Sequence, residues 1–490
     1  GWVDRGKHSS QGLTGALQWQ FLPRWQLQLS HAEGRHKPMR YFGVPLIDGK
    51  PLEALRRTNY NVQDARITFR DHWSELTLQG SPSDNVAVRS RLYHIRSNRL
   101  WFDAENYTWD AARQQIRLAG DTAIRHHQKQ TGNTTDVTFD GKLLGMDNTI
   151  SAGFDLNHSS LQHDNNTYSG NPRYVSLLSP ETGFFDSDLP FIPRYRNTAD
   201  QYALFVEDRL AVTGQLSLVA GLRHDRIRIR RDDLITGSRA FSRTWNSTGH
   251  RLGAVYALTP TLSVYAQHSR AADPSTAPLM MSASGAKADM TIGRQIEVGI
   301  KQSLPQQRGE WTLAAYNITK HNLQSRDPAN PDNSIQVGKQ SSRGIEGTLS
   351  LALSSTLRLD ADATVLRARY DDFNDAVDGA IVSRSGNTPP DVPERLANLW
   401  LSWQMHPQWT LSGGARHVGK RHANRANDLT LPAYTTADLA LKWQPSDATT
   451  LALHGHNIFN RHYYSTVYYN EKQWFVGESP RVLFTIDHRF

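Results

Sequence analysis

The chain has no cysteine in its 490 residues, which excludes disulfides, Fe–S clusters and thiolate-ligated zinc. It also has no run of 18 or more apolar residues, so no segment can cross a membrane as a helix. The N-terminal stretch GWVDRGKHSSQG lacks the apolar core of a signal peptide, so an exported protein would have lost its signal. If the chain lies in a membrane, it can do so only as a β-barrel.

A catalytic arrangement is also missing from the sequence. Ser, His and Asp are scattered, with neither a nucleophile elbow nor a Gly-rich phosphate loop before a helix. We therefore expect no enzyme and no cofactor. Lysine and arginine exceed the acidic residues by eight, but they are spread along the whole chain. That scatter argues against a nucleic-acid partner, which needs a concentrated basic footprint.

What the sequence does contain is period-two alternation in paired segments. Leu13, Leu17 and Trp19 fall on one face of a predicted strand, with glutamines on the other. Pro23 and Arg24 form a short turn, and the alternation then resumes. The pattern recurs along the chain and predicts about nineteen antiparallel strands. They cover residues 11–22, 24–34, 64–80, 84–97, 118–144, 147–161, 199–213, 214–232, 243–258, 260–271, 291–304, 309–323, 339–354, 356–370, 394–406, 408–422, 433–445, 448–461 and 479–490.

Three features favour a transmembrane barrel over a soluble β-sandwich, which stays the alternative. The polar face carries charges on strand after strand, and many strands exceed the usual five or six residues. Short turns alternate with long loops, as they do in transmembrane barrels. Aromatic residues flank the short turns and would form one interfacial girdle: Phe21, Trp25, Trp403, Trp409 and Trp443. The predicted fold class is an all-β, antiparallel transmembrane β-barrel.

Strand parity adds an expectation about completeness. Bacterial single-chain barrels have even strand numbers, with both termini on the periplasmic side. The count is odd, and the first predicted strand runs into a short turn, which lies on the periplasmic side. Residue 1 would therefore lie outside the cell. We therefore expect residues 1–490 to be an N-terminally truncated barrel domain from which an odd number of strands is absent.

Several motifs follow one another toward the C-terminus. Segment 386–403 (GNTPPDVPERLANLWLSW) enters a strand through Asn-Leu-Trp, and 414–443 carries Leu-Pro-x-Tyr followed by an Asp. Segment 454–464 (HGHNIFNRHYY) ends the penultimate strand, and PRVLFTIDHRF closes the chain on Phe490. In this order the motifs resemble TonB-dependent outer-membrane receptors. Upstream segments resemble the siderophore-receptor type of that family: 203–227, 293–304, 309–323 and 341–351.

The resemblance implies a 22-stranded family barrel, of which about 19 strands are present, and an N-terminal plug that this sequence does not contain. It further implies a monomer in the outer membrane of a Gram-negative bacterium, in contact with outer-membrane lipid. The expected function is active uptake of a ferric siderophore, energised by the TonB–ExbB–ExbD complex through the plug. The alternatives are a TonB-dependent receptor for haem, cobalamin or a saccharide, a passive porin, and a structural or adhesive barrel.

Aromatic and cationic side chains in the long loops are the candidate ligand contacts. Ferric siderophores are compact, often anionic, and expose apolar surface, which suits rigid aromatic rings and guanidinium groups. For each candidate, a role in the interfacial girdle or in the core of a loop is the competing explanation. The candidates are Tyr41, Phe42, Trp101, Tyr107, Trp109, Tyr174, Arg194, Tyr195, Tyr468, Tyr469 and Trp474.

Histidine is abundant, yet we expect no metal site. His454 and His456 share one strand face, but a metal would need a third ligand and an orienting shell. In the family the siderophore supplies the donor atoms to iron. The segment SRAADPSTAPLMM (269–281) lacks the stretches that flank the histidine of haem receptors, so the resemblance ranks haem below a siderophore.

Overall fold

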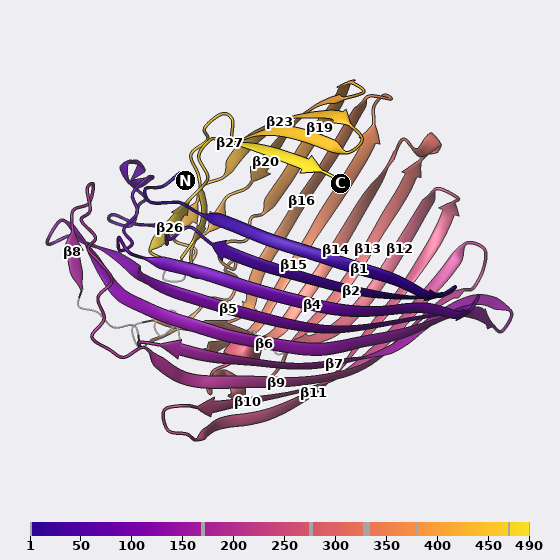
Figure 1. Ribbon diagram of the computed structural model, residues 1–490, viewed down its shortest axis with the longest axis horizontal. Coiled ribbons are helices and arrows are strands. Elements are labelled where there is room, and N and C mark those ends of the chain that lie inside the picture. Colours follow the sequence, from indigo (N-terminus) through magenta and orange to yellow (C-terminus); the bar gives the residue numbers. More distant parts are fainter. Residues whose placement is uncertain are drawn as a thin grey trace.

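The computed structural model describes residues 2–167, 172–273, 278–326, 334–377, 380–468 and 471–489. One twenty-stranded antiparallel sheet dominates it and curves into a barrel wall (Figure 1). Its strands are β1 Ser9–Leu22, β2 Trp25–Lys37, β4 Arg66–Ser83, β5 Val86–Asp110, β6 Gln115–Leu143, β7 Met146–Asn165, β8 Arg173–Val175, β9 Ile192–Ala211, β10 Leu216–Asp233, β11 Arg239–Thr259, β12 Leu262–Asp273, β13 Thr291–Leu304, β14 Gly309–Arg326, β15 Ser334–Ala352, β16 Leu357–Asp372, β19 Arg395–His406, β20 Trp409–Val418, β23 Tyr434–Ser446, β24 Thr449–His456 and β27 Arg481–His488.

Apart from β8, which has only three residues, each strand of this sheet coincides with one of the nineteen predicted segments. Successive long strands pair with one another along the chain. Within the described residues, β1 pairs only with β2 and β27 only with β24, so these two strands are the edges of the sheet. No helix in the described ranges is long and apolar enough to cross a membrane.

The alternation sorts side chains onto two faces, as the sequence predicts. Register places Leu17 opposite Leu29, Leu29 opposite Leu76, and Leu76 opposite Leu92. These four leucines are 37–68% exposed, so they form the outer side of the wall. The positions between them, such as Gln28 and its neighbour Thr77, face the lumen. Near the short turns Trp409 and Trp443 stack with ring centroids 5.5 Å apart, in agreement with the predicted girdle.

Short elements gather at the end of the barrel with the long loops, on the left in Figure 1. They include β3 Val44–Pro45, η1 Glu53–Leu55, β21 Arg421–His422, β22 Thr430–Leu431, β25 Tyr464–Val467 and β26 Gln473–Val476. β3, β25 and β26 form one three-stranded sheet, although β3 and β26 are more than 400 residues apart. Buried side chains from these elements pack together, so the long loops form a cohesive layer with its own small cores.

One predicted loop is wrong. The predicted strands 84–97 and 118–144 leave residues 98–117 as a loop, but β5 continues to Asp110 and β6 begins at Gln115. The two strands stay paired to this tip, where Asp110 lies opposite Gln115. Residues on both faces of this hairpin are buried or half-buried, so its side chains no longer alternate between apolar and polar types. Trp101, Tyr107 and Trp109 are therefore strand residues.

Candidate functional site

A glutamine at the centre of the loop layer holds three distant segments together. Gln473 on β26 is fully buried. Its side-chain oxygen accepts a hydrogen bond from the Tyr107 backbone N–H at 2.9 Å. Its amide nitrogen donates to the carbonyl oxygens of Phe42 and Glu105, each at 2.9 Å. One side chain thus satisfies three backbone groups that burial would otherwise leave unpaired.

Six of the predicted contact residues lie in or beside this layer. The Phe42 ring meets the Tyr468 ring edge-on at 5.6 Å, and the Tyr468 hydroxyl donates to Glu105 at 2.6 Å. The Trp109 ring nitrogen donates to Asp48 at 3.1 Å. The remaining three, Tyr41, Tyr107 and Trp474, are at most 5% exposed and form the interior of the layer.

The other predicted residues lie elsewhere. Tyr174 is on β8, where the Arg113 guanidinium sits 4.4 Å from its ring centre. Arg194 donates to the backbone carbonyl oxygen and to the side-chain oxygen of Asn165. These two hydrogen bonds hold the start of β9 against the end of β7. Tyr469 lies outside the described residues.

Trp101 and Tyr195 belong to a row of rings that runs across adjacent strands. Trp101 contacts the Phe69 ring on β4 and the His126 ring on β6, each with centroids 5.1 Å apart. His126 and His163 share a hydrogen bond of 2.8 Å between ring nitrogens. His163 stacks on Tyr195 at 4.6 Å.

The row ends on a cation, because the Arg231 guanidinium on β10 lies 3.5 Å from the Tyr195 ring centre. Strand parity shows which side the row faces. Trp101 lies an odd number of positions from the outward Leu92, as Arg231 does from the outward Leu222. Alternate residues of a strand point to opposite faces, so Trp101 and Arg231 face the lumen. We call Phe69, Trp101, His126, His163, Tyr195 and Arg231 the luminal row.

The segment after β12 folds back onto the wall beside this row. Leu279 and Met281 pack with luminal residues of β9 to β11, including Ile229 and Trp245. The Asn197 amide donates to the carbonyl oxygens of Leu279 and Met281 at 3.0 Å. The Met281 carbonyl also accepts from Arg231 at 3.1 Å, so the cation of the row is held in place.

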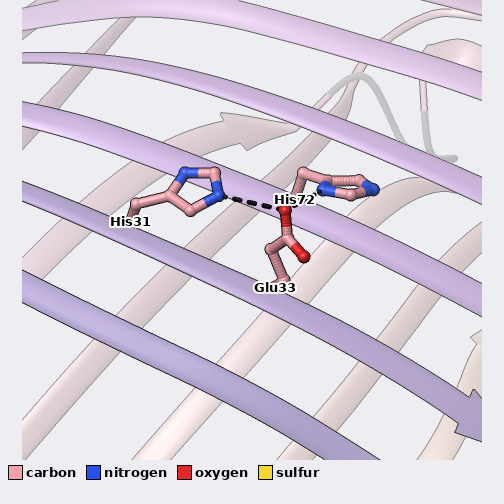
Figure 2. Close-up of side chains that lie close together, drawn as sticks. All are labelled: His31, Glu33 and His72. Carbon is pink, nitrogen blue, oxygen red and sulfur yellow. Dashed lines mark hydrogen bonds and ion pairs between the residues drawn. The ribbon is translucent and has the colours of Figure 1, made fainter.

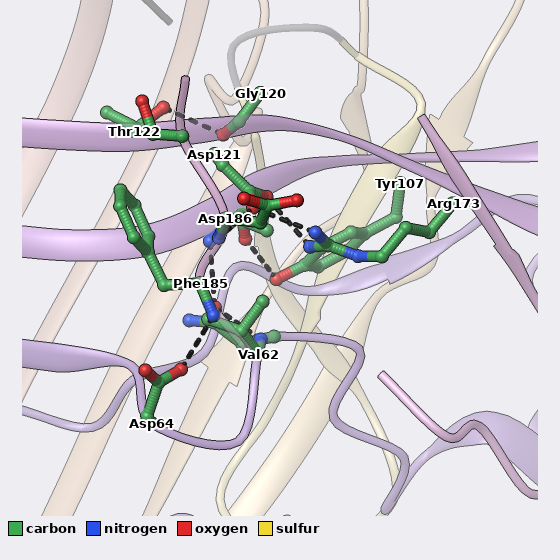
Figure 3. Close-up of polar contacts among 12 residues, drawn as sticks. Val62, Asp64, Tyr107, Gly120, Asp121, Thr122, Arg173, Phe185 and Asp186 are labelled. Atoms are coloured by element: carbon green, nitrogen blue, oxygen red, sulfur yellow. Dashed lines mark hydrogen bonds and ion pairs between the residues drawn. The ribbon is translucent and has the colours of Figure 1, made fainter. Parts of the chain in front are cut away.

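An ion pair fixes a second covering segment, between β8 and β9. The Arg173 guanidinium donates both of its terminal nitrogens to Asp121 at 2.8 Å, and Asp121 is 2% exposed. The same carboxylate accepts from the Asp186 backbone N–H at 2.7 Å, as Figure 3 shows. The Phe185 N–H next to it donates to Asp64 at 2.8 Å. The 173–186 segment is therefore tied to β6 and to the loop before β4.

Burial changes the acidity of several groups in the loops. Burial raises the pKa of Tyr464 to about 12 and raises the pKa of Glu471 above its usual range.

Near the N-terminus, burial lowers the pKa of Arg5. Its guanidinium donates to the carbonyl oxygens of Asn59 and Asn61 at 2.6 and 2.7 Å. The guanidinium of this arginine therefore cross-links loops, although part of the residue stays exposed.

His31, Glu33 and His72 form a cluster that the sequence did not predict, on the outer face of β2 and β4 (Figure 2). The Glu33 carboxylate lies 3.4 Å from His31 and 3.3 Å from His72. Their three donor atoms lie within 4.8 Å of one another, which is a ligand set suited to a divalent cation. The two imidazole–carboxylate contacts by themselves also account for the arrangement.

Sequence reasoning missed Gln473, Asp121 and His163, and it also missed three further members of the luminal row, Phe69, His126 and Arg231. A glutamine and an aspartate in polar stretches carry no local signal, because only the folded chain brings their partners close. His163 lies two residues beyond the predicted strand 147–161, and extending the alternation of that strand from Leu156 would have assigned it to the lumen.

The family model described as TonB dependent receptor-like, beta-barrel, matches residues 40–458. The chain belongs to the TonB-dependent receptor family. It is thus an outer-membrane β-barrel of the Gram-negative type, in a family of transport receptors rather than enzymes.

Two proteins similar in sequence are named as receptors. The metal-pseudopaline receptor CntO of Pseudomonas aeruginosa is 26% identical over 463 residues, covering 91% of this chain and 60% of that protein. The ferrioxamine receptor of Yersinia enterocolitica is 26% identical over 375 residues, covering 71% and 50%. The chain therefore spans about three-fifths of the first of these relatives.

Solved structures agree on the fold. The siderophore receptor PiuA from Acinetobacter baumannii superposes with a TM-score of 0.88 at 17% identity, over 99% of this chain and 75% of that one. The ferric-catecholate import receptor Fiu of Escherichia coli gives 0.84 at 17% identity, over 100% and 76%.

Proposed function

We propose that this chain is the barrel of a receptor that takes up a ferric siderophore by TonB-energised transport. The luminal row carries the proposal, because it sets aromatic faces beside a fixed guanidinium under a cohesive loop layer. Ferric siderophores offer the complementary surface, since many combine an anionic charge with flat or apolar groups. The names of the relatives support the same class of ligand.

The proposed ligand contacts divide into two groups. Trp101, Tyr195 and Arg231 contact the ligand in the lumen. Phe42 and Tyr468 contact it at the loop layer, with Trp109, Tyr174 and Arg194 around its margin. Tyr41, Tyr107 and Trp474 act indirectly, by holding the layer in shape, because their side chains are buried.

The other partners follow from the same proposal. The receptor acts as a monomer, works with the TonB–ExbB–ExbD complex, and catalyses no reaction. Opening a path through the lumen needs work from outside the barrel, and the chain contains neither a phosphate-binding loop nor a cofactor motif that could supply it.

Uptake of radioactive iron tests this function. The intact receptor gene is expressed in an outer-membrane receptor-deficient strain, with and without functional TonB. Cells are offered iron as hydroxamate, catecholate and carboxylate siderophores, with haem and cobalamin as further substrates. We expect TonB-dependent uptake of at least one ferric siderophore. Uptake of haem or cobalamin alone would move the receptor to another nutrient, and TonB-independent leakage of all solutes would make it a porin.

A further inference from the structure

The outer face of the barrel carries an apolar furrow that the uptake function does not use. It crosses β14, β15, β16, β19 and β20 and has a volume of about 600 Å³. Its floor consists of small outward residues that register places side by side. Gly347 lies opposite Ala363, and Ala363 lies opposite Ala397. Its walls are the larger outward side chains Trp311, Leu313, Leu349 and Leu399.

A basic pocket of about 200 Å³ lies directly above this furrow. Arg343 on β15 pairs with Arg367 on β16, one alternation step beyond Ile345 and two beyond Gly347. Arg369 and Lys339 also line the pocket, and Asp371 is its single carboxylate. Four cations against one acid leave a net charge of +3. Asp371 pairs with Arg369 at 2.8 Å, whereas Arg343 and Arg367 are exposed and have no ion pair within the described residues.

Height along the barrel places this pocket at the upper edge of the membrane. Arg343 lies nine residues before the end of β15 at Ala352. At about 3.3 Å per residue and a tilt of about 40°, that is roughly 23 Å along the barrel axis. The outward apolar band of such barrels is about 25 Å tall. Arginine facing lipid is costly at mid-depth but costs little at the interface, so these cations sit where head groups are.

From this juxtaposition we propose that the outer face of β14–β20 binds one phosphorylated acyl lipid of the outer leaflet. Arg343 and Arg367 donate to its phosphate, because guanidinium groups match phosphate geometry with paired hydrogen bonds. An acyl chain lies in the furrow, where the small residues of the floor leave room for it. A second copy of this chain is a poorer occupant, because two basic pockets would repel each other on approach.

Native mass spectrometry of the detergent-purified receptor tests the site. The probes are bis-phosphorylated lipid A, its monophosphorylated form, phosphatidylcholine and inorganic phosphate. We expect the bis-phosphorylated lipid to remain bound, phosphatidylcholine to dissociate, and inorganic phosphate at millimolar concentration not to compete. The double variant R343Q/R367Q should lower the bound fraction at least tenfold.

The matched control is R226Q/R228Q, two exposed outward arginines on β10, a strand that does not line the furrow. It should change binding less than twofold. The variant G347L/A363L fills the floor and should also weaken binding; a Cβ at Gly347 meets its nearest atom at 3.6 Å, so the backbone there accepts a Cβ without a clash. Retention of the heat-modifiable band on gels shows that each variant has folded.

Three results would overturn the proposal. If R343Q/R367Q and R226Q/R228Q behave alike, the outer face attracts anions generally. If inorganic phosphate binds as well as the lipid, the pocket is an anion site without a lipid. If the wild-type receptor is a dimer that G347L/A363L separates, a second copy covers the furrow instead.

Discussion

Gln473 and Tyr107 are 366 positions apart in the chain, yet the Tyr107 backbone N–H donates to the Gln473 side chain at 2.9 Å. Through this bond, β26 of the loop layer is attached to the extended β5–β6 hairpin. The same amide group holds the Phe42 carbonyl, so the ring of Phe42 is placed by Gln473 as well. The loop layer is therefore organised by a residue that no ligand is expected to contact.

Replacement of Gln473 by leucine should loosen the layer without unfolding the barrel. The change removes the Gln473 hydrogen bonds to one buried backbone N–H and two carbonyl groups, and a buried group left unsatisfied costs about 1–3 kcal/mol. Hydrogen exchange should show faster exchange of the Tyr107 amide and of residues 42–46, while the amides of β13 stay protected. The control is Gln18→Leu, an exposed position of β1. Unchanged exchange at Tyr107 would contradict the role given to Gln473.

Asp121→Asn should release the segment between β8 and β9. Loss of the charge leaves the Arg173 guanidinium without its bidentate partner, and breaking a largely buried pair costs about 3 kcal/mol. Limited proteolysis should then cut within 173–190 at a rate at least tenfold above that of the native chain. Asp147→Asn removes an exposed ion pair with Lys142 and should leave the rate unchanged. Equal resistance of Asp121→Asn would show that other contacts hold the segment.

The stability of the loop around Glu471 should fall as the pH rises. Burial raises the pKa of this carboxyl group, with Arg425 opposing the shift and Asp375 adding to it. A raised folded-state pKa means that the stabilisation is present below the unfolded pKa of about 4.3 and is lost as the pH passes through the folded value. Glu471→Gln should therefore increase the protection of this loop at pH 7 and have no effect near pH 3.5. Exchange rates corrected for intrinsic pH dependence measure this, and equal protection of both proteins at pH 7 would contradict it.

Arg231→Gln should weaken binding of an anionic siderophore about tenfold. The cation lies against Tyr195 at the end of the luminal row, where its charge attracts the ligand. Its removal should also flatten the dependence of affinity on salt concentration. Arg228→Gln, on the outer face of the same strand, is the control and should leave both quantities unchanged. Equal effects of the two substitutions would indicate that only overall charge matters.

The strands were predictable because the lipid and the lumen impose a two-residue period that is written locally. Each long strand of the wall therefore agrees with a predicted segment. The extension of β5 beyond residue 97 was not predictable, because the adjacent residues Asp103 and Ala104 are both buried there and no alternation survives. Site prediction had the same limit: Trp101 and Tyr195 could be nominated from composition, but their connection through His126 and His163 depends on register across four strands.

The most direct test of the account is equilibrium binding of the transported ferric siderophore to the purified receptor, followed by tryptophan fluorescence. We predict that the double variant W101A/Y195A raises the dissociation constant at least thirtyfold. The control W403A, on the lipid-facing girdle, should leave it within twofold of the native value. If W101A/Y195A binds as tightly as W403A, the luminal row is not the ligand site.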